Sequence, residues 1–148
     1  MLPNLLLATL AVVVLSACST FASLSGNQVI TPHNWVIMHD QLANNPPACE
    51  MPYAELRLER ITAVQGLVKG SMCGKCIKVA NAADPQKSMY VLVVDMGGRG
   101  LDVSTVAYKQ IFGQDTDPAS AVWTEAPDSA CAGVWNKRRS STINTRRR

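Results

Sequence analysis

The chain has 148 residues, of which 47% are hydrophobic and 17% charged, and its formal net charge is +3. This length suits one domain with a single core and excludes an assembly of several large domains. The positive charge lies at the end of the chain, because the last twelve residues hold six of the fourteen Lys and Arg residues. We therefore expect an acidic folded part, followed over residues 136–148 by a basic disordered tail that binds anionic surfaces.

An apolar run of eleven residues lies near the N-terminus, from Leu5 to Leu15. A membrane-spanning helix needs about 20 such residues, and the run is followed by small residues, so residues 1–22 are predicted to form a secretory signal peptide. The sequence Leu-Ser-Ala-Cys ending at Cys18 also fits a bacterial lipoprotein box, in which Cys18 would be lipidated. We expect a secreted, extracellular protein, with a bacterial lipoprotein as the alternative.

Four cysteines remain after either kind of processing: Cys49, Cys73, Cys76 and Cys131. An even number in a secreted chain predicts two disulfides, although four cysteines allow three pairings. The two histidines, His33 and His39, have a spacing that matches no metal-ligand pattern. We therefore expect no metal site and no cofactor.

The first half of the mature chain gives weak structural signals. Residues 23–48 form a lead-in, with a strand or extended segment at the apolar patch Trp35–Met38 and a turn at Asn44–Pro47. From Tyr53 to Gly66 the alternation of Leu56 and Leu58 with charged residues favours a strand over a helix.

The second half gives clearer signals. Cys76–Ala80 alternates apolar and polar residues, and a turn leads from it into Lys87–Val94, so these segments predict a β-hairpin. Tyr90–Val94 is apolar without alternation, which is typical of a strand buried on both faces. Glycines then reverse the chain into a short strand at Leu101–Val103, and a last strand is expected at Ala121–Thr124.

A short helix is expected between these last two strands. Ser104 is a suitable N-cap, Ala107 and Ile111 share one helical stripe, and Gly113 stands where a left-handed C-terminal residue belongs. Short strands with one small helix and two disulfides predict a compact all-β barrel. The carboxylates Asp95 and Asp102 flank its glycine loop, with Arg99 between them, and form the candidate site.

The sequence Cys-Gly-Lys-Cys-Ile-Lys-Val-Ala-Asn at residues 73–81, with Val-Val-Asp at 93–95 and Gly-Gly-Arg-Gly-Leu-Asp-Val at 97–103, resembles the barwin and expansin superfamily. The resemblance extends from about Cys49 to Cys131. It implies a six-stranded double-psi β-barrel over residues 49–135, with one or two short helices. It also implies the disulfide pairs Cys49–Cys73 and Cys76–Cys131.

The same resemblance implies a secreted, monomeric protein that binds a cell-wall polysaccharide such as chitin, cellulose or peptidoglycan. Relatives include hydrolytic endoglucanases, bacterial rare lipoproteins that act on peptidoglycan, and small protease inhibitors, so the fold does not fix the function. We expect a polysaccharide-binding protein that does not hydrolyse its ligand. The alternatives are a protease inhibitor or effector on the same barrel and a peptidoglycan-lytic lipoprotein.

Asp102 matches the aspartate that hydrolytic relatives use as general acid, and Asp95 matches the aspartate that ends the preceding strand. A glycosidase needs a second carboxylate, and the Tyr-Trp-Asp motif that supplies it in the endoglucanase relatives is missing here. Asp102 is therefore the only catalytic candidate, and hydrolysis is disfavoured. The predicted ligand-binding residues are Asp95, Arg99, Asp102, Tyr90 and Trp123.

Structural roles compete with binding roles for these residues. Asp102 could accept hydrogen bonds at the helix start, with Arg99 as its ion-pair partner. Tyr90 and Trp123 could stack on sugar rings, but they lie in predicted strands, where packing in the core is the favoured alternative.

Overall fold

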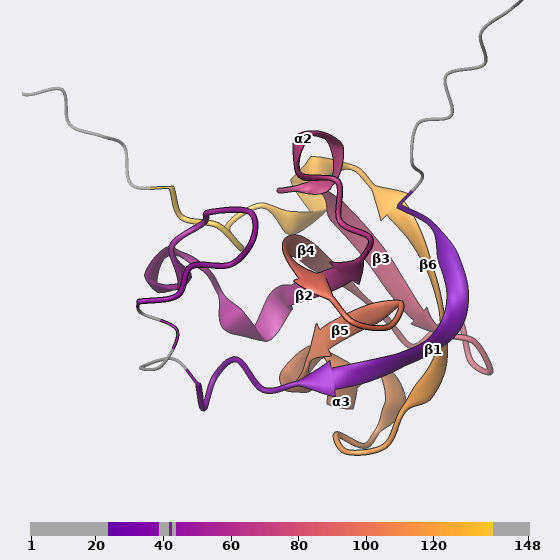
Figure 1. The fold of residues 1–148 in the computed structure, drawn as a ribbon. Coiled ribbons are helices and arrows are strands. Elements are labelled where there is room, and N and C mark those ends of the chain that lie inside the picture. Colours follow the sequence, from indigo (N-terminus) through magenta and orange to yellow (C-terminus); the bar gives the residue numbers. More distant parts are fainter. Residues whose placement is uncertain (1–23, 39–41, 43, 138–148) are drawn as a thin grey trace, which may run out of the picture.

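The computed structural model describes residues 24–38, 42 and 44–137 (Figure 1). The predicted signal peptide, the lipoprotein-box Cys18, His39 and most of the basic tail lie outside the described residues. Within the described part, no helix is long and apolar enough to cross a membrane.

Six strands of the described chain form a closed barrel in the order β1-β5-β2-β4-β3-β6 (Figure 1). Their bounds are β1 Gly26–His33, β2 Ile61–Gln65, β3 Cys76–Asn81, β4 Ser88–Gly97, β5 Leu101–Ser104 and β6 Ala119–Ala126. The pairs β1/β5 and β2/β4 are parallel, and the other neighbours are antiparallel. The predicted all-β class with six strands is confirmed.

Short helices connect these strands. Those whose bounds lie within the described residues are the α-helices α2 (Lys69–Met72) and α3 (Thr105–Phe112) and the 3-10 turns η1 (Tyr53–Glu55), η2 (Leu58–Arg60) and η3 (Asp128–Cys131). In α3 the predicted stripe is buried, and Gly113 ends the helix with a positive φ of 75°. Tyr108 ties this helix to the following loop, because its hydroxyl donates to the backbone carbonyl of Asp117 at 2.7 Å.

The predicted hairpin is confirmed, since β3 and β4 pair antiparallel from Cys76 opposite Leu92 to Ala80 opposite Ser88. All four residues Val91–Val94 are buried. Val91 and Val93 belong to the core inside the barrel, whereas Leu92 and Val94 belong to a second core outside it. Burial on both faces explains why this strand is apolar without alternation.

The second core covers one side of the barrel. Residues 34–38 and 44–60 lie beside the sheet on that side, together with the end of the described chain (Figure 1). Their buried side chains pack against Ile61, Ala63, Leu92 and Val94 of the sheet; they include Trp35, Met51, Tyr53, Leu56, Leu58, Cys131 and Val134. The barrel therefore has an inner core and an outer core that share the strands β2 and β4.

Both disulfides have the pairing that the resemblance implies. The S–S distance is 2.01 Å for Cys49–Cys73 and 2.02 Å for Cys76–Cys131. Cys76 and Cys131 are buried in the outer core, and Cys49 is partly buried beside it. The two bridges hold the outer segments against the barrel.

The start of the barrel differs from the sequence prediction. The barrel was expected to begin at Cys49, but β1 begins at Gly26 and closes the sheet between β5 and β6. The apolar patch at Trp35–Met38 is a turn after this strand, in which Trp35 is buried and Ile37 is 81% exposed. Residues 23–48 therefore contribute a barrel strand in addition to a lead-in.

The predicted strand over 53–66 is correct only for its last third. Residues Tyr53–Arg60 form the two 3-10 turns, and only Ile61–Gln65 pairs in the sheet. Leu56 and Leu58 alternate with charged residues because both point into the outer core. The same alternation arises in a turn that packs on a sheet, so it misled the strand prediction.

Ser104 takes the N-cap position of α3 without capping it. Its side chain makes no cap hydrogen bond, and its buried Oγ has no hydrogen-bond partner among the described residues. A buried hydroxyl without a partner costs about 1–3 kcal/mol of desolvation free energy.

We therefore expect Ser104→Ala to leave the free energy of unfolding unchanged or to raise it by about 1 kcal/mol, whereas loss of a working N-cap would lower it by a similar amount. Urea unfolding of the variant and the parent protein distinguishes these results. A loss of 1 kcal/mol or more would show that the hydroxyl has a partner in solution.

Candidate functional site

Four residues form a row across four neighbouring strands. Thr31 of β1 pairs with Asp102 of β5, Asp102 pairs with Ala63 of β2, and Ala63 pairs with Asp95 of β4. Paired residues of a sheet point to the same face. That face is the outside of the barrel, because Leu101 and Val103, which flank Asp102, fill the inner core. We call this set the carboxylate row.

The row brings the two predicted carboxylates onto one face but not into contact. Two strand spacings separate them, so their Cα atoms lie about 9.5 Å apart. Ala63 stands between them, and its side chain is only 3% exposed because it packs in the outer core.

The carboxylate of Asp102 is held by two donors. The hydroxyl of Thr31 donates to Oδ1, and the backbone N–H of Gly98 donates to Oδ2 at 3.1 Å. Gly97 allows this approach, since a Cβ at that position would lie 2.9 Å from Oδ2. The glycine loop thus has a definite use: it folds back closely enough to bind and orient the Asp102 side chain.

The carboxylate of Asp95 is held by three hydrogen bonds, two of them from the segment that packs on the outside of the barrel. Its Oδ1 accepts hydrogen bonds from the backbone N–H groups of Ala48 and Met96, each at 2.8 Å, and its Oδ2 accepts one from the Tyr53 hydroxyl at 3.3 Å. Burial, followed by the neighbouring Asp95 charge, raises the pKa of Tyr53 to about 12. Tyr53 is therefore a neutral donor over the whole physiological pH range.

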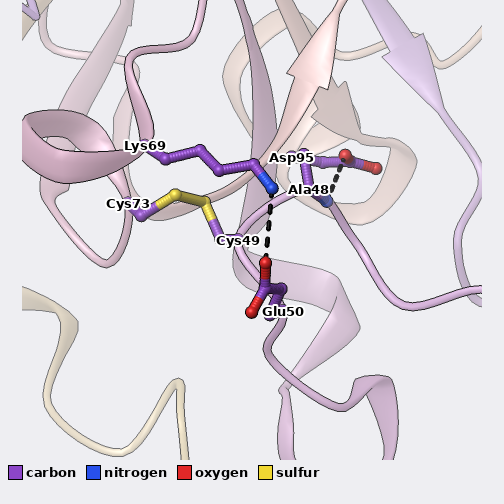
Figure 2. A network of polar contacts seen from close by, with 6 residues as sticks. All are labelled: Ala48, Cys49, Glu50, Lys69, Cys73 and Asp95. Atoms are coloured by element: carbon purple, nitrogen blue, oxygen red, sulfur yellow. Dashed lines mark hydrogen bonds and ion pairs between the residues drawn. A yellow bond between two sulfur atoms is a disulfide. The ribbon is translucent and has the colours of Figure 1, made fainter.

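The loop that supplies the Ala48 donor is fixed by covalent and ionic contacts. Figure 2 shows the Ala48–Asp95 hydrogen bond next to the Cys49–Cys73 disulfide and the ion pair between Lys69 and Glu50, whose atoms are 3.4 Å apart. The ion pair is exposed, so it contributes little stability. The disulfide is the stronger constraint on the backbone that holds Asp95.

The remaining predicted ligand residues lie elsewhere or make no contact with the row. Arg99 is exposed in the glycine loop next to Asp102, but it forms no ion pair within the described part of the chain. Tyr90 is on the outer face of β4 and 39% exposed, but it is about 16 Å along the strand from Asp95. Trp123 is 6% exposed and packs inside the barrel, as the core alternative proposed.

Two residues of the site were missed by the sequence reasoning, Thr31 and Tyr53. Thr31 lies in the unrecognised strand β1, and Tyr53 lies in a 3-10 turn that resembled a strand. They contact carboxylates that are 71 and 42 residues away in the sequence. Among the described residues, no three acidic, histidine or cysteine side chains gather as metal ligands would.

Comparison with known proteins gives a match to structures only. No family model and no curated protein sequence matches the chain. The structure of cerato-platanin 3 from M. perniciosa matches with a TM-score of 0.57 and 17% identity, over 72% of this chain and 98% of that chain. The apo expansin of Clavibacter michiganensis matches with a TM-score of 0.52 and 18% identity, over 70% of this chain and 51% of that one.

This chain is a double-psi β-barrel. A third match is the d78n mutant of the Clavibacter expansin in complex with cellohexaose, with a TM-score of 0.51 and 17% identity. It covers 70% of this chain and 50% of the expansin, so the double-psi barrel spans about half the length of that protein. At such identities the likeness shows the fold, and the function has to be argued from the site.

Proposed function

We propose that this protein binds a cell-wall polysaccharide across the carboxylate row and does not hydrolyse it. The observation that carries the proposal is the row itself: two carboxylates, each held in a fixed orientation, stand on the same outer face of the barrel. Carboxylate oxygens are strong acceptors for sugar hydroxyl groups. A solved protein of the same fold, the Clavibacter expansin mutant, was crystallised with cellohexaose, which supports a glucan or related glycan as the ligand.

The geometry of the row supports binding without hydrolysis. A retaining glycosidase holds its two carboxyl groups about 5–5.5 Å apart and an inverting one about 6.5–9.5 Å apart. Asp95 and Asp102 start from backbones about 9.5 Å apart, which does not fit the retaining arrangement and lies at the upper limit of the inverting one. Both oxygens of each carboxylate accept hydrogen bonds from the protein. These contacts orient both carboxylates as hydrogen-bond acceptors, which suits the binding of sugar hydroxyl groups.

The two disulfides support secretion, because such bridges persist in oxidising compartments. We infer that residues 1–22 are a signal peptide and that the mature protein acts outside the cell. The wall polymer is cellulose, chitin or peptidoglycan, and the basic tail adds attraction to anionic surfaces.

Asp102→Asn tests the proposed function. The amide keeps the size of the side chain and one acceptor but loses the charge, so we expect retention on the preferred polysaccharide to fall at least tenfold while the stability changes by about 1 kcal/mol or less. Pull-down of the purified protein on cellulose, chitin and peptidoglycan, with thermal melting of the same samples, measures both quantities.

Asp128→Asn is the matched control, because Asp128 is exposed in η3 and is not part of the carboxylate row. This variant should bind like the parent protein. If Asp102→Asn also binds like the parent and only melts at a lower temperature, Asp102 is structural and the carboxylate row is not a ligand site.

A further inference from the structure

A concave site lies at one end of the barrel and shares no residue with the carboxylate row. It is a cavity of about 250 Å³ between the start of β1, the end of β2, the end of α2, the turn before β5, and β6. In Figure 1 this is the end where α2 lies and where β1 begins beside β6. We call it the mouth cavity. The residues that matter for its chemistry are Gln28, Val64, Gln65, Met72, Gly100 and Trp123.

The floor of the mouth cavity is apolar and rigid. Val64, Met72 and Trp123 are each 6% exposed. Gly26 covers one face of the Trp123 ring: a Cβ on Gly26 would lie 2.2 Å from Cζ2 and 2.6 Å from each of the two carbons bonded to it, which places it directly above the ring plane. The indole is therefore held in one orientation, with its remaining exposed part at the cavity.

The buried indole leaves a hydrogen-bond donor unused. Trp123 Nε1 donates to no residue within the described part of the chain. Tryptophan N–H groups in buried rings usually find a partner. A donor of this kind at the wall of a cavity indicates that a ligand atom can accept from it.

Two carboxamides stand at the rim with spare hydrogen-bonding groups. Gln65 Oε1 accepts from the backbone N–H of Gly100 at 3.0 Å, which leaves the NH2 group of Gln65 free to donate. Gln28 makes no side-chain hydrogen bond to the described residues, and it lies across Gly100, where a Cβ would be 2.8 Å from its Nε2. The rim therefore offers both donors and an acceptor.

Among the described residues, the lining contains no charged side chain. None of these side chains would be an ion-pair partner for a charged ligand, so we expect the cavity to favour an uncharged one. The volume is below the range of about 300–1,000 Å³ that is typical of pockets for drug-sized molecules, so the ligand group is small. It needs an acceptor for the indole and amide donors, a donor for the Gln28 carbonyl, and an apolar end for the floor.

We propose that the mouth cavity binds a small uncharged secondary amide, with its methyl group on the floor formed by Val64, Met72 and Trp123. The amide carbonyl accepts from the indole and glutamine donors, and the amide N–H donates to Gln28 Oε1. An acetamido sugar and an N-acetylated amino acid both carry this group. This proposal does not rest on the carboxylate row, because it uses other residues and another face of the barrel.

The test is a titration followed by NMR of the three tryptophan indole N–H groups. N-methylacetamide is the simplest probe, because it is an uncharged secondary amide. Acetate, which is charged, and glucose, which is uncharged but has no amide group, are the controls. N-acetylglucosamine and N-acetylalanine amide distinguish the two sources. We expect the Trp123 resonance to shift saturably with N-methylacetamide and with at least one of the two N-acetyl compounds, while the Trp35 and Trp135 resonances stay in place.

Gln28→Ala should raise the dissociation constant of the amide probes about tenfold. The substitution removes no side-chain hydrogen bond of the described fold. Gln86→Ala, in an exposed turn, is the control and should have no effect. The proposal is overturned if the Trp123 resonance does not move, if acetate or glucose moves it equally, or if Gln28→Ala binds like the parent. Asp102→Asn should leave this titration unchanged, so the two sites succeed or fail separately.

Discussion

Replacing both Cys76 and Cys131 by Ala should lower the free energy of unfolding by about 4 kcal/mol. The bridge closes a loop of 55 residues, for which the chain-entropy model gives a stabilisation of about that size. Both residues are buried in the outer core, where the bridge joins the first residue of β3 to the last residue of η3. Because small domains have only about 5–15 kcal/mol of net stability, this loss is a large fraction of the total.

Urea unfolding under non-reducing conditions measures the effect. The matched comparison replaces Cys49 and Cys73, which close a shorter loop of 24 residues and should cost about 3.5 kcal/mol. Double replacement avoids leaving a free thiol in either variant. A loss below about 1 kcal/mol for the Cys76/Cys131 pair would mean that the outer core holds η3 in place without the bridge.

The second large effect is expected at Gly26, which faces Trp123 directly across the β1/β6 pair. Gly26→Ala would place a methyl carbon 2.2 Å from the ring carbon Cζ2, far inside van der Waals contact. Either the ring or the start of β1 must move, and overpacking of this kind costs about 1–3 kcal/mol. Thermal and urea unfolding should both show the loss.

Gly98→Ala is the control, since a Cβ there meets no atom within 4 Å and the backbone has no positive φ. The Gly26→Ala loss should shrink in a Trp123→Leu background, where the ring is absent, and a double-mutant cycle measures that coupling. If the two substitutions are additive, the contact between Gly26 and the indole is not the cause of the loss.

The parts of the fold that were predictable are those with strong local patterns. The buried strand at Val91–Val94, the hairpin with β3 and the helix ending at Gly113 each follow from residues that are neighbours in the sequence. Strand β1 gives no such signal, because Ile30 is its only fully buried residue. Its place depends on pairing with β5 and β6, which lie some 70 and 90 residues further along.

The predicted residues of the site also lie in a strong local pattern, whereas the missed ones do not. Asp95 and Asp102 were found because they stand in a motif with fixed spacing, and the structure places both on one face. Their partners Thr31 and Tyr53 come from segments that only the closed barrel brings near. Trp123 was predicted to lie in a strand, but whether its side chain faced inward depended on the register of β6, which the sequence does not show.

The pairing of β1 has a consequence for the order of assembly. Strand β1 pairs only with β5 and β6, which are the last two strands of the barrel in the sequence. Its backbone hydrogen bonds to both neighbours are therefore complete only after almost the whole domain has been synthesised. Contacts of such long sequence separation are entropically costly to close and make folding slow. The contact between Thr31 and Asp102 therefore forms only after β5 has been synthesised, and a nascent chain that stops before Leu101 has Asp95 but lacks the strand that completes the carboxylate row.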